Sequence, residues 1–220
     1  VIGDSITAAG KWQKKLEELL GMNVATHAKG GIGILRMTDG DNGLDGTYNA
    51  ETDKNGVLRP LMAADVEGVS LIVVLPAYNE RATVLGSVGD CHPEQETICG
   101  RIQYLLNRIY EELEDAGNLL CHVLVATPHC AGKYPYVDAD GYEEYPTGTG
   151  QTMEKLSDTI KAVAQANNVA VCDLWHESGI NRRTWSVFGA QKNAVNEQYA
   201  KYQICLLYTS PSPRDRQKSR

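Results

Sequence analysis

Apolar residues along the chain form short continuous runs that alternate with stripes at helical spacing. The runs predict five strands, at 1–3, 22–26, 70–75, 119–126 and 169–172. The stripes predict four helices, at 12–20, 97–116, 153–163 and 190–203. The first of these helices is expected to bury one face, made of Trp12, Leu16, Leu19 and Leu20. Strands that alternate with helices predict an α/β fold with a parallel sheet covered by helices.

Small polar residues and glycines follow the first three predicted strands. GDSIT occupies 3–7, THAKGGIGI occupies 26–34 and LPAYNE occupies 75–80. In parallel α/β folds the ligand crevice lies at the carboxyl ends of the strands, where these segments fall. Taken alone, each has a structural interpretation. A serine before a helix is typical of an N-cap, a glycine of a turn with positive φ, and an asparagine of an Asx turn.

These three segments, in this order, resemble the first three sequence blocks of the GDSL or SGNH hydrolase family of esterases and lipases. The resemblance runs over most of residues 1–204, with Ala77 in place of the usual glycine of the third block. It implies a three-layer α/β/α sandwich with a mostly parallel five-stranded, flavodoxin-like sheet. It also implies that Ser5 is a nucleophile attacking an ester carbonyl. The backbone amides of Ser5 and Gly31 and the side-chain amide of Asn79 then form the oxyanion hole, with Gly33 as the second choice for Gly31.

A serine hydroxyl needs a base, and the family places Asp-x-x-His near its C-terminal end. Asp173 and His176 have this spacing, but they directly follow the strand predicted at 169–172 and lack the usual residues after the histidine. Two interpretations stay open. Either Asp173 and His176 are the catalytic pair, or His176 is a histidine at the start of a helix and the family's last block lay beyond residue 204. The second implies an enzyme that lacks its base.

Both ends of the sequence bear on the domain boundaries. The chain begins at Val1 where a strand is already under way, which leaves a secretory signal untestable and the compartment open. The composition changes abruptly in residues 205–220, which are rich in Ser, Pro and Arg. They resemble a peptide translated from sequencing-adapter DNA at the end of an environmental gene fragment. We therefore expect one hydrolase-like domain at 1–204, incomplete at both ends, and a non-native disordered tail at 205–220.

Composition and apolar run lengths exclude several classes of binding partner. The 28 acidic and 21 basic residues give a formal charge of −7, which argues against nucleic acid. No apolar run reaches the roughly 18–20 residues that span a bilayer. None of the six cysteines forms Cys-x-x-Cys, and no metal or organic cofactor is expected. The resemblance to the hydrolase family implies as substrate a small-molecule or carbohydrate ester with an acetyl or short acyl group. The alternative is a non-catalytic carbohydrate-binding or structural module of the same fold, and the oligomeric state stays open.

Overall fold

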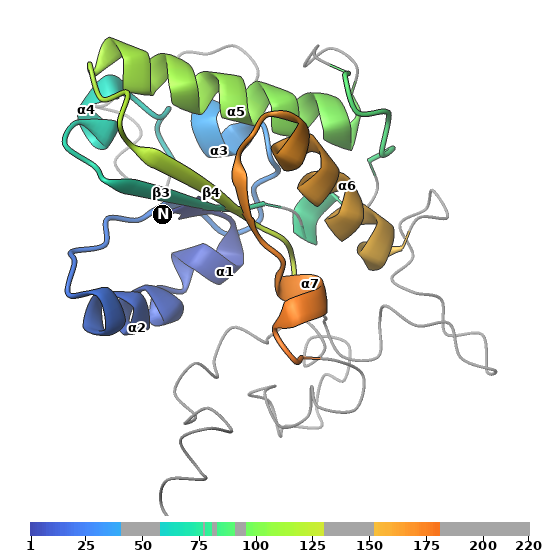
Figure 1. Ribbon diagram of the computed structural model, residues 1–220, viewed down its shortest axis with the longest axis horizontal. Helices are drawn as coiled ribbons and strands as arrows, with labels where there is room; N and C mark the ends of the chain where they lie inside the picture. Colours follow the sequence, from blue (N-terminus) through green and yellow to red (C-terminus); the bar gives the residue numbers. More distant parts are fainter. Residues whose placement is uncertain (41–57, 77, 81–82, 91–95, 130–151, 181–220) are drawn as a thin grey trace, which may run out of the picture.

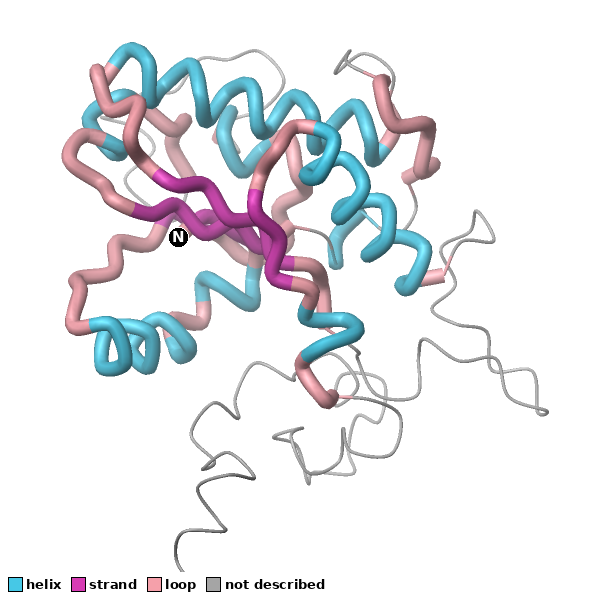
Figure 2. Tube along the Cα trace, in the orientation of Figure 1, coloured by secondary structure: helices cyan, strands magenta, loops and turns pink. Residues whose placement is uncertain are grey.

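The computed structural model describes residues 1–40, 58–76, 78–80, 83–90, 96–129 and 152–180. In these ranges five strands form one parallel sheet in the order β2-β1-β3-β4-β5 (Figure 2). The strands are β1 (Ile2–Gly3), β2 (His27–Ala28), β3 (Leu71–Leu75), β4 (His122–Ala126) and β5 (Ala170–Cys172). The helix predicted at 190–203, the domain boundary at residue 204 and the tail at 205–220 lie outside the described residues.

Helices cover both faces of this sheet, which confirms the predicted α/β fold. They are α1 (Ser5–Ala8), α2 (Lys11–Leu20), α3 (Arg36–Asp39), α4 (Ala63–Val66), the 3-10 helix η1 (Tyr78–Glu80), α5 (Ile98–Asp115), α6 (Met153–Ala166) and α7 (Leu174–Glu177). Figure 1 shows α3, α4, α5 and α6 on one side of the sheet and α1 and α2 on the other. No helix in the described ranges is long and apolar enough to cross a membrane.

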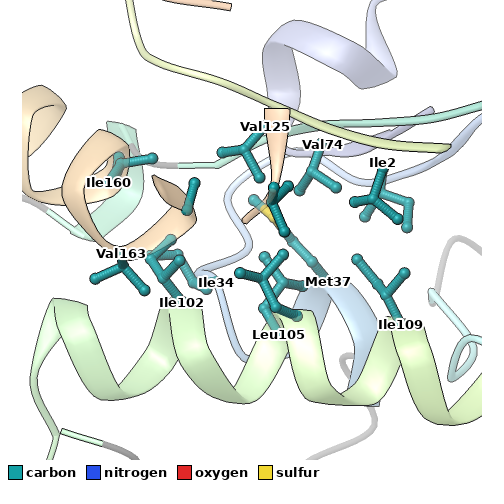
Figure 3. Packing of buried hydrophobic residues seen from close by; sticks show 14 of the residues in the cluster. Ile2, Ile34, Met37, Val74, Ile102, Leu105, Ile109, Val125, Ile160 and Val163 are labelled. Atoms are coloured by element: carbon teal, nitrogen blue, oxygen red, sulfur yellow. The ribbon is translucent and has the colours of Figure 1, made fainter. Parts of the chain in front are cut away.

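The main hydrophobic core lies between α5 and the sheet. Ile102, Leu105 and Ile109 of α5 are fully buried and point toward Val74 of β3 and Val125 of β4 (Figure 3). The spacing of three and four residues between these side chains places them on one helical face, as the sequence stripe predicts. The packing of this face on the sheet explains why the long helix has a fixed position above the strands.

A smaller cluster on the opposite face of the sheet joins Ile6 of α1 to Leu75 and Ala126. Successive side chains of a strand point to opposite faces, so Val74 enters the main core and Leu75 enters this cluster. Both faces of β3 are therefore covered, which is the reason that its sequence is apolar throughout.

The strand register brings the carboxyl ends of the strands into one row. Gly3 pairs with Ala28 on one side and with Leu75 on the other. Val74 pairs with Val125 one residue earlier, and Cys172 pairs with the last residue of β4. Residues that follow β1, β2, β3 and β5 consequently leave the sheet at the same edge.

Two strand predictions need correction. The second strand lies at His27–Ala28 and not at 22–26, because its pairing with β1 begins where His27 lies opposite Ile2. The strand predicted at 119–126 begins at His122, where pairing with Leu71 starts. The apolar residues before it, Leu119 and Leu120, are exposed by 73% and 92%.

The predicted buried face of α2 is also wrong at its C-terminal end. Leu19 and Leu20 are exposed by 70% and 50%, and no described element covers them. The buried residue is instead Gln13, whose side-chain amide donates to the carbonyl oxygen of Thr7 in α1. A hydrogen bond to the neighbouring helix thus orients the start of α2.

Candidate active site

Ser5 is the first residue of α1 and is exposed at the carboxyl end of β1. The preceding residue, Asp4, is 1% exposed, and its carboxylate accepts the backbone N–H of Ile6 at 2.9 Å. Asp4 is therefore the N-cap of α1, the role that the sequence alone allowed for the serine. The cap fixes the strand-to-helix turn, and the Ser5 hydroxyl makes no hydrogen bond within the described part of the chain.

The loop after β2 lies against Ser5. A β-carbon placed on Gly30 would be 3.7 Å from the β-carbon of Ser5, an ordinary contact distance. The next residue, Gly31, has φ +83, a conformation that favours glycine, and is exposed. Among the described residues, the backbone N–H groups of Ser5 and Gly31 have no hydrogen-bond acceptor. Two free donors thus belong to segments that touch.

Asn79 follows β3 and is hydrogen-bonded to the loop after β2. Its side-chain nitrogen Nδ2 donates to the carbonyl oxygen of Ile32 at 2.8 Å, across 47 residues of sequence. An asparagine amide carries two N–H groups, and in the described ranges the second one has no acceptor. The hydrogen bond to Ile32 orients the amide and leaves one donor available beside the loop that carries Gly31.

Glu80, for which sequence reasoning gave no role, connects the same two segments. It is 5% exposed, and its Oε1 accepts the backbone N–H of Ile34 at 2.6 Å. A β-carbon on Gly33 would overlap this carboxylate, so the space beside Gly33 is already filled. The available signal was the position of Glu80 directly after Asn79, in a segment that already carried the resemblance.

Asp173 and His176 form a carboxylate–imidazole pair after β5. Asp173 is 5% exposed and is the N-cap of α7, and each of its oxygens lies 3.0 Å from Nδ1 of His176. The carboxylate also accepts from Nζ of Lys161 at 2.7 Å and from the Thr127 hydroxyl at 3.3 Å. Burial would raise the pKa of Asp173, but hydrogen bonds from Lys161 and His176 outweigh it and lower the pKa to about 2. Asp173 is thus a stable anion at neutral pH.

The other ring nitrogen of His176 lies near two carboxylates of α6. Nε2 lies 3.9 Å from a carboxylate oxygen of Glu154 and 3.9 Å from one of Asp158. β5 is separated from β1 by β3 and β4, and three strand spacings of about 4.8 Å place the two strands about 14 Å apart. In the described part of the chain, no hydrogen bond joins Ser5 to a histidine. The structure therefore brings Ser5, Gly31 and Asn79 together, and Asp173 with His176 separately.

A second histidine, His129, follows β4, the strand next to β5, at the carboxyl end of the sheet. His129 lies three residues after the end of β4, closer in strand order to β1 than His176 is. Burial lowers the pKa of His129 to about 4, so its imidazole is neutral at pH 7. The lowered pKa makes this imidazole a weaker base than an ordinary histidine, so only its place after β4 makes His129 a second base candidate to be tested beside His176.

A cavity of about 470 Å³ lies at the opposite edge of the sheet, away from these residues. Its lining includes Val1 and Leu71 near the starts of β1 and β3, together with His27, Arg59 and Asp65. Arg59 and Asp65 form an ion pair there. None of the site residues expected from the sequence lines this cavity.

Comparisons with known proteins support the fold. No protein-family model and no curated protein matches the sequence. A crystal structure of a protein from Lactobacillus plantarum matches 93% of this chain and 90% of its own, with a TM-score of 0.57 and 16% identity. That of a possible lipase from Chitinophaga pinensis matches 80% of this chain and 66% of its own, with a TM-score of 0.52 and 17% identity. At these identities the likeness shows the fold alone, and it confirms the expected α/β fold with a five-stranded parallel sheet.

Proposed function

We propose that this protein is a serine esterase that hydrolyses an acetyl or short acyl ester, on a small molecule or a carbohydrate, through an acyl-enzyme. The observation that carries the proposal is the grouping of an exposed Ser5 with unused N–H donors on Ser5, Gly31 and Asn79. The hydrolase-like fold and the three sequence blocks agree with it. The reaction needs no metal or organic cofactor.

In the proposed reaction, Oγ of Ser5 attacks the ester carbonyl carbon while its proton passes to a base. The carbonyl oxygen becomes an oxyanion that accepts hydrogen bonds from the amides of Ser5 and Gly31 and from Nδ2 of Asn79. Collapse of this intermediate expels the alcohol, which takes up the proton, and leaves Ser5 acylated. Water then attacks the acyl group by the same route, releases the acid and regenerates the hydroxyl.

Gly31 is the better candidate for the backbone donor than Gly33. The segment that carries Gly31 touches Ser5, and the Gly31 N–H has no acceptor among the described residues. Gly33 instead lies against the carboxylate of Glu80. The carboxylate already fills the space beside Gly33, so we assign the donor to Gly31.

The test measures release of p-nitrophenol from p-nitrophenyl acetate by the purified chain and by Ser5→Ala. We expect hydrolysis above the buffer rate that disappears in Ser5→Ala. Equal rates in the two proteins would contradict the proposal. An inactive wild-type chain would contradict it too, and would favour either the non-catalytic module of the same fold or an enzyme that lacks its base.

The base is assigned in the same assay with His176→Gln and His129→Gln. A loss of kcat in His176→Gln, matched by Asp173→Asn, assigns the base to the Asp173–His176 pair. A rate unchanged by these two substitutions but reduced in His129→Gln assigns it to His129. In that case Asp173 and His176 serve to hold α7 against α6 through Lys161.

A further inference from the structure

Glu80 is a buried anion at the junction of the two loops that carry Gly31 and Asn79. One carboxylate oxygen, Oε1, accepts the backbone N–H of Ile34 at 2.6 Å. The other, Oε2, accepts the hydroxyl of Thr83 at 2.8 Å and forms an ion pair with Arg101 of α5. Every polar contact of this side chain thus ties η1 to a neighbouring segment.

The loop after β2 is held from η1 at two points. Asn79 donates to the carbonyl oxygen of Ile32, and Glu80 accepts the N–H of Ile34, so bonds of opposite polarity lie on either side of Gly33. The close approach of the carboxylate at Gly33 leaves no room for a β-carbon. A loop that is bonded at two backbone positions and packed between them has little freedom to shift relative to η1.

Arg101 supplies the positive charge that balances the carboxylate of Glu80. A buried carboxylate without a partner would oppose an oxyanion that forms nearby, because like charges repel strongly where water is excluded. The Arg101 guanidinium contacts Oε2, and the same nitrogen, Nη1, donates to the Thr83 hydroxyl at 3.1 Å. Arg101 is the fourth residue of α5, the helix that packs on the main core. The arginine therefore comes from a helix whose apolar face is buried in the main core.

We propose that Glu80 and Arg101 are positioning residues of the oxyanion hole. Glu80 fixes the loop that carries Gly31 against η1, which carries Asn79, and Arg101 neutralises the carboxylate so that the hole remains favourable for negative charge. The inference rests on the proposed esterase function. Neither residue touches the reacting atoms, and both act through the placement of the donors.

The test compares kcat and KM for p-nitrophenyl acetate in Glu80→Gln, Arg101→Met and the double variant. Glutamine keeps an acceptor for Ile34 but not the ion pair, and we expect kcat to fall about tenfold with KM within about twofold. Arg101→Met leaves the carboxylate unbalanced and is expected to lower kcat further. Adding Glu80→Gln to Arg101→Met removes that charge, so the double variant should recover to the level of Glu80→Gln. A merely structural role predicts losses that add.

Asp65→Asn is the matched control. Asp65 also accepts a backbone N–H, from Met62 at 3.0 Å, and also pairs with an arginine, Arg59, but it lies beside the cavity at the opposite edge. We expect this variant to lower the melting temperature and to leave kcat unchanged. Should Arg101→Met fail to fold, Thr83→Val removes one hydrogen bond to Glu80 and leaves the ion pair with Arg101 intact. We then expect kcat to fall two- to threefold, roughly the effect of one weakened hydrogen bond.

The outcomes separate the two proposals. If Ser5→Ala abolishes hydrolysis while Glu80→Gln leaves kcat unchanged well below its melting temperature, the positioning role is wrong and the esterase stands. If the double variant is slower than Arg101→Met, the charge-balancing role of Arg101 is wrong. If Ser5→Ala is as active as the wild type, the proposed function itself fails, and the positioning role fails with it.

Discussion

Asp173→Asn removes a buried carboxylate whose pKa is about 2 in the folded protein. The unfolded chain holds an aspartate at its ordinary pKa of about 3.9, so folding favours the ionised form by nearly two pKa units. Each unit corresponds to about 1.4 kcal/mol, which gives roughly 2–3 kcal/mol of unfolding free energy from the charged form. A folded pKa below the unfolded one means that this contribution is present above about pH 4 and is lost as the pH falls to about 2.

The assay is urea unfolding followed by circular dichroism at pH values from 2 to 7, for the wild type and Asp173→Asn. We expect the variant to be less stable by about 2 kcal/mol at pH 7, with the difference shrinking toward pH 2. Asp158→Asn, an exposed position on α6, is the matched control and should follow the wild-type curve. A stability difference between wild type and Asp173→Asn that stays constant across this range would refute the reasoning.

Three further substitutions test the site and the core. Asn79→Ala removes an oxyanion donor, and kcat should fall about 10²- to 10³-fold in the p-nitrophenyl acetate assay; a fall below threefold would contradict its role. Gly31→Ala meets open space but strains a backbone at φ +83, so we expect unfolding free energy to drop by about 1 kcal/mol and kcat to fall as well; an unchanged kcat would point to another backbone donor. Leu105→Ala empties part of the core under α5 and should lower unfolding free energy by about 2–5 kcal/mol, measured in urea; a loss under 1 kcal/mol would mean that the site repacks.

The parts of the fold that the sequence predicts well are those that local pattern determines. α5 lies within two residues of its predicted bounds, because its stripe of apolar side chains faces one continuous core. β3 matches for a similar reason, since both of its faces are covered. β2 is different: its position depends on where β1 offers backbone groups for pairing, and no local pattern carries that information.

The candidate site divides in the same way. The contact of Asp173 with His176 spans three residues, so their spacing already suggests it. The bonds from Asn79 to Ile32 and from Glu80 to Ile34 span 47 and 46 residues, and only the sheet order brings these segments together. The same order places Asp173 and His176 three strands away from Ser5, a separation that the Asp-x-x-His spacing does not reveal.

The central claim is that Ser5 is a nucleophile, and covalent labelling tests it most directly. The folded protein is treated with a fluorophosphonate, which reacts with activated serine hydroxyls, and the tryptic peptide 1–11 is examined by mass spectrometry. We predict one phosphonyl adduct on Ser5, none in Ser5→Ala and none in protein unfolded in urea before treatment. An unlabelled Ser5 in the folded protein, or equal labelling of folded and unfolded chains, would contradict the account.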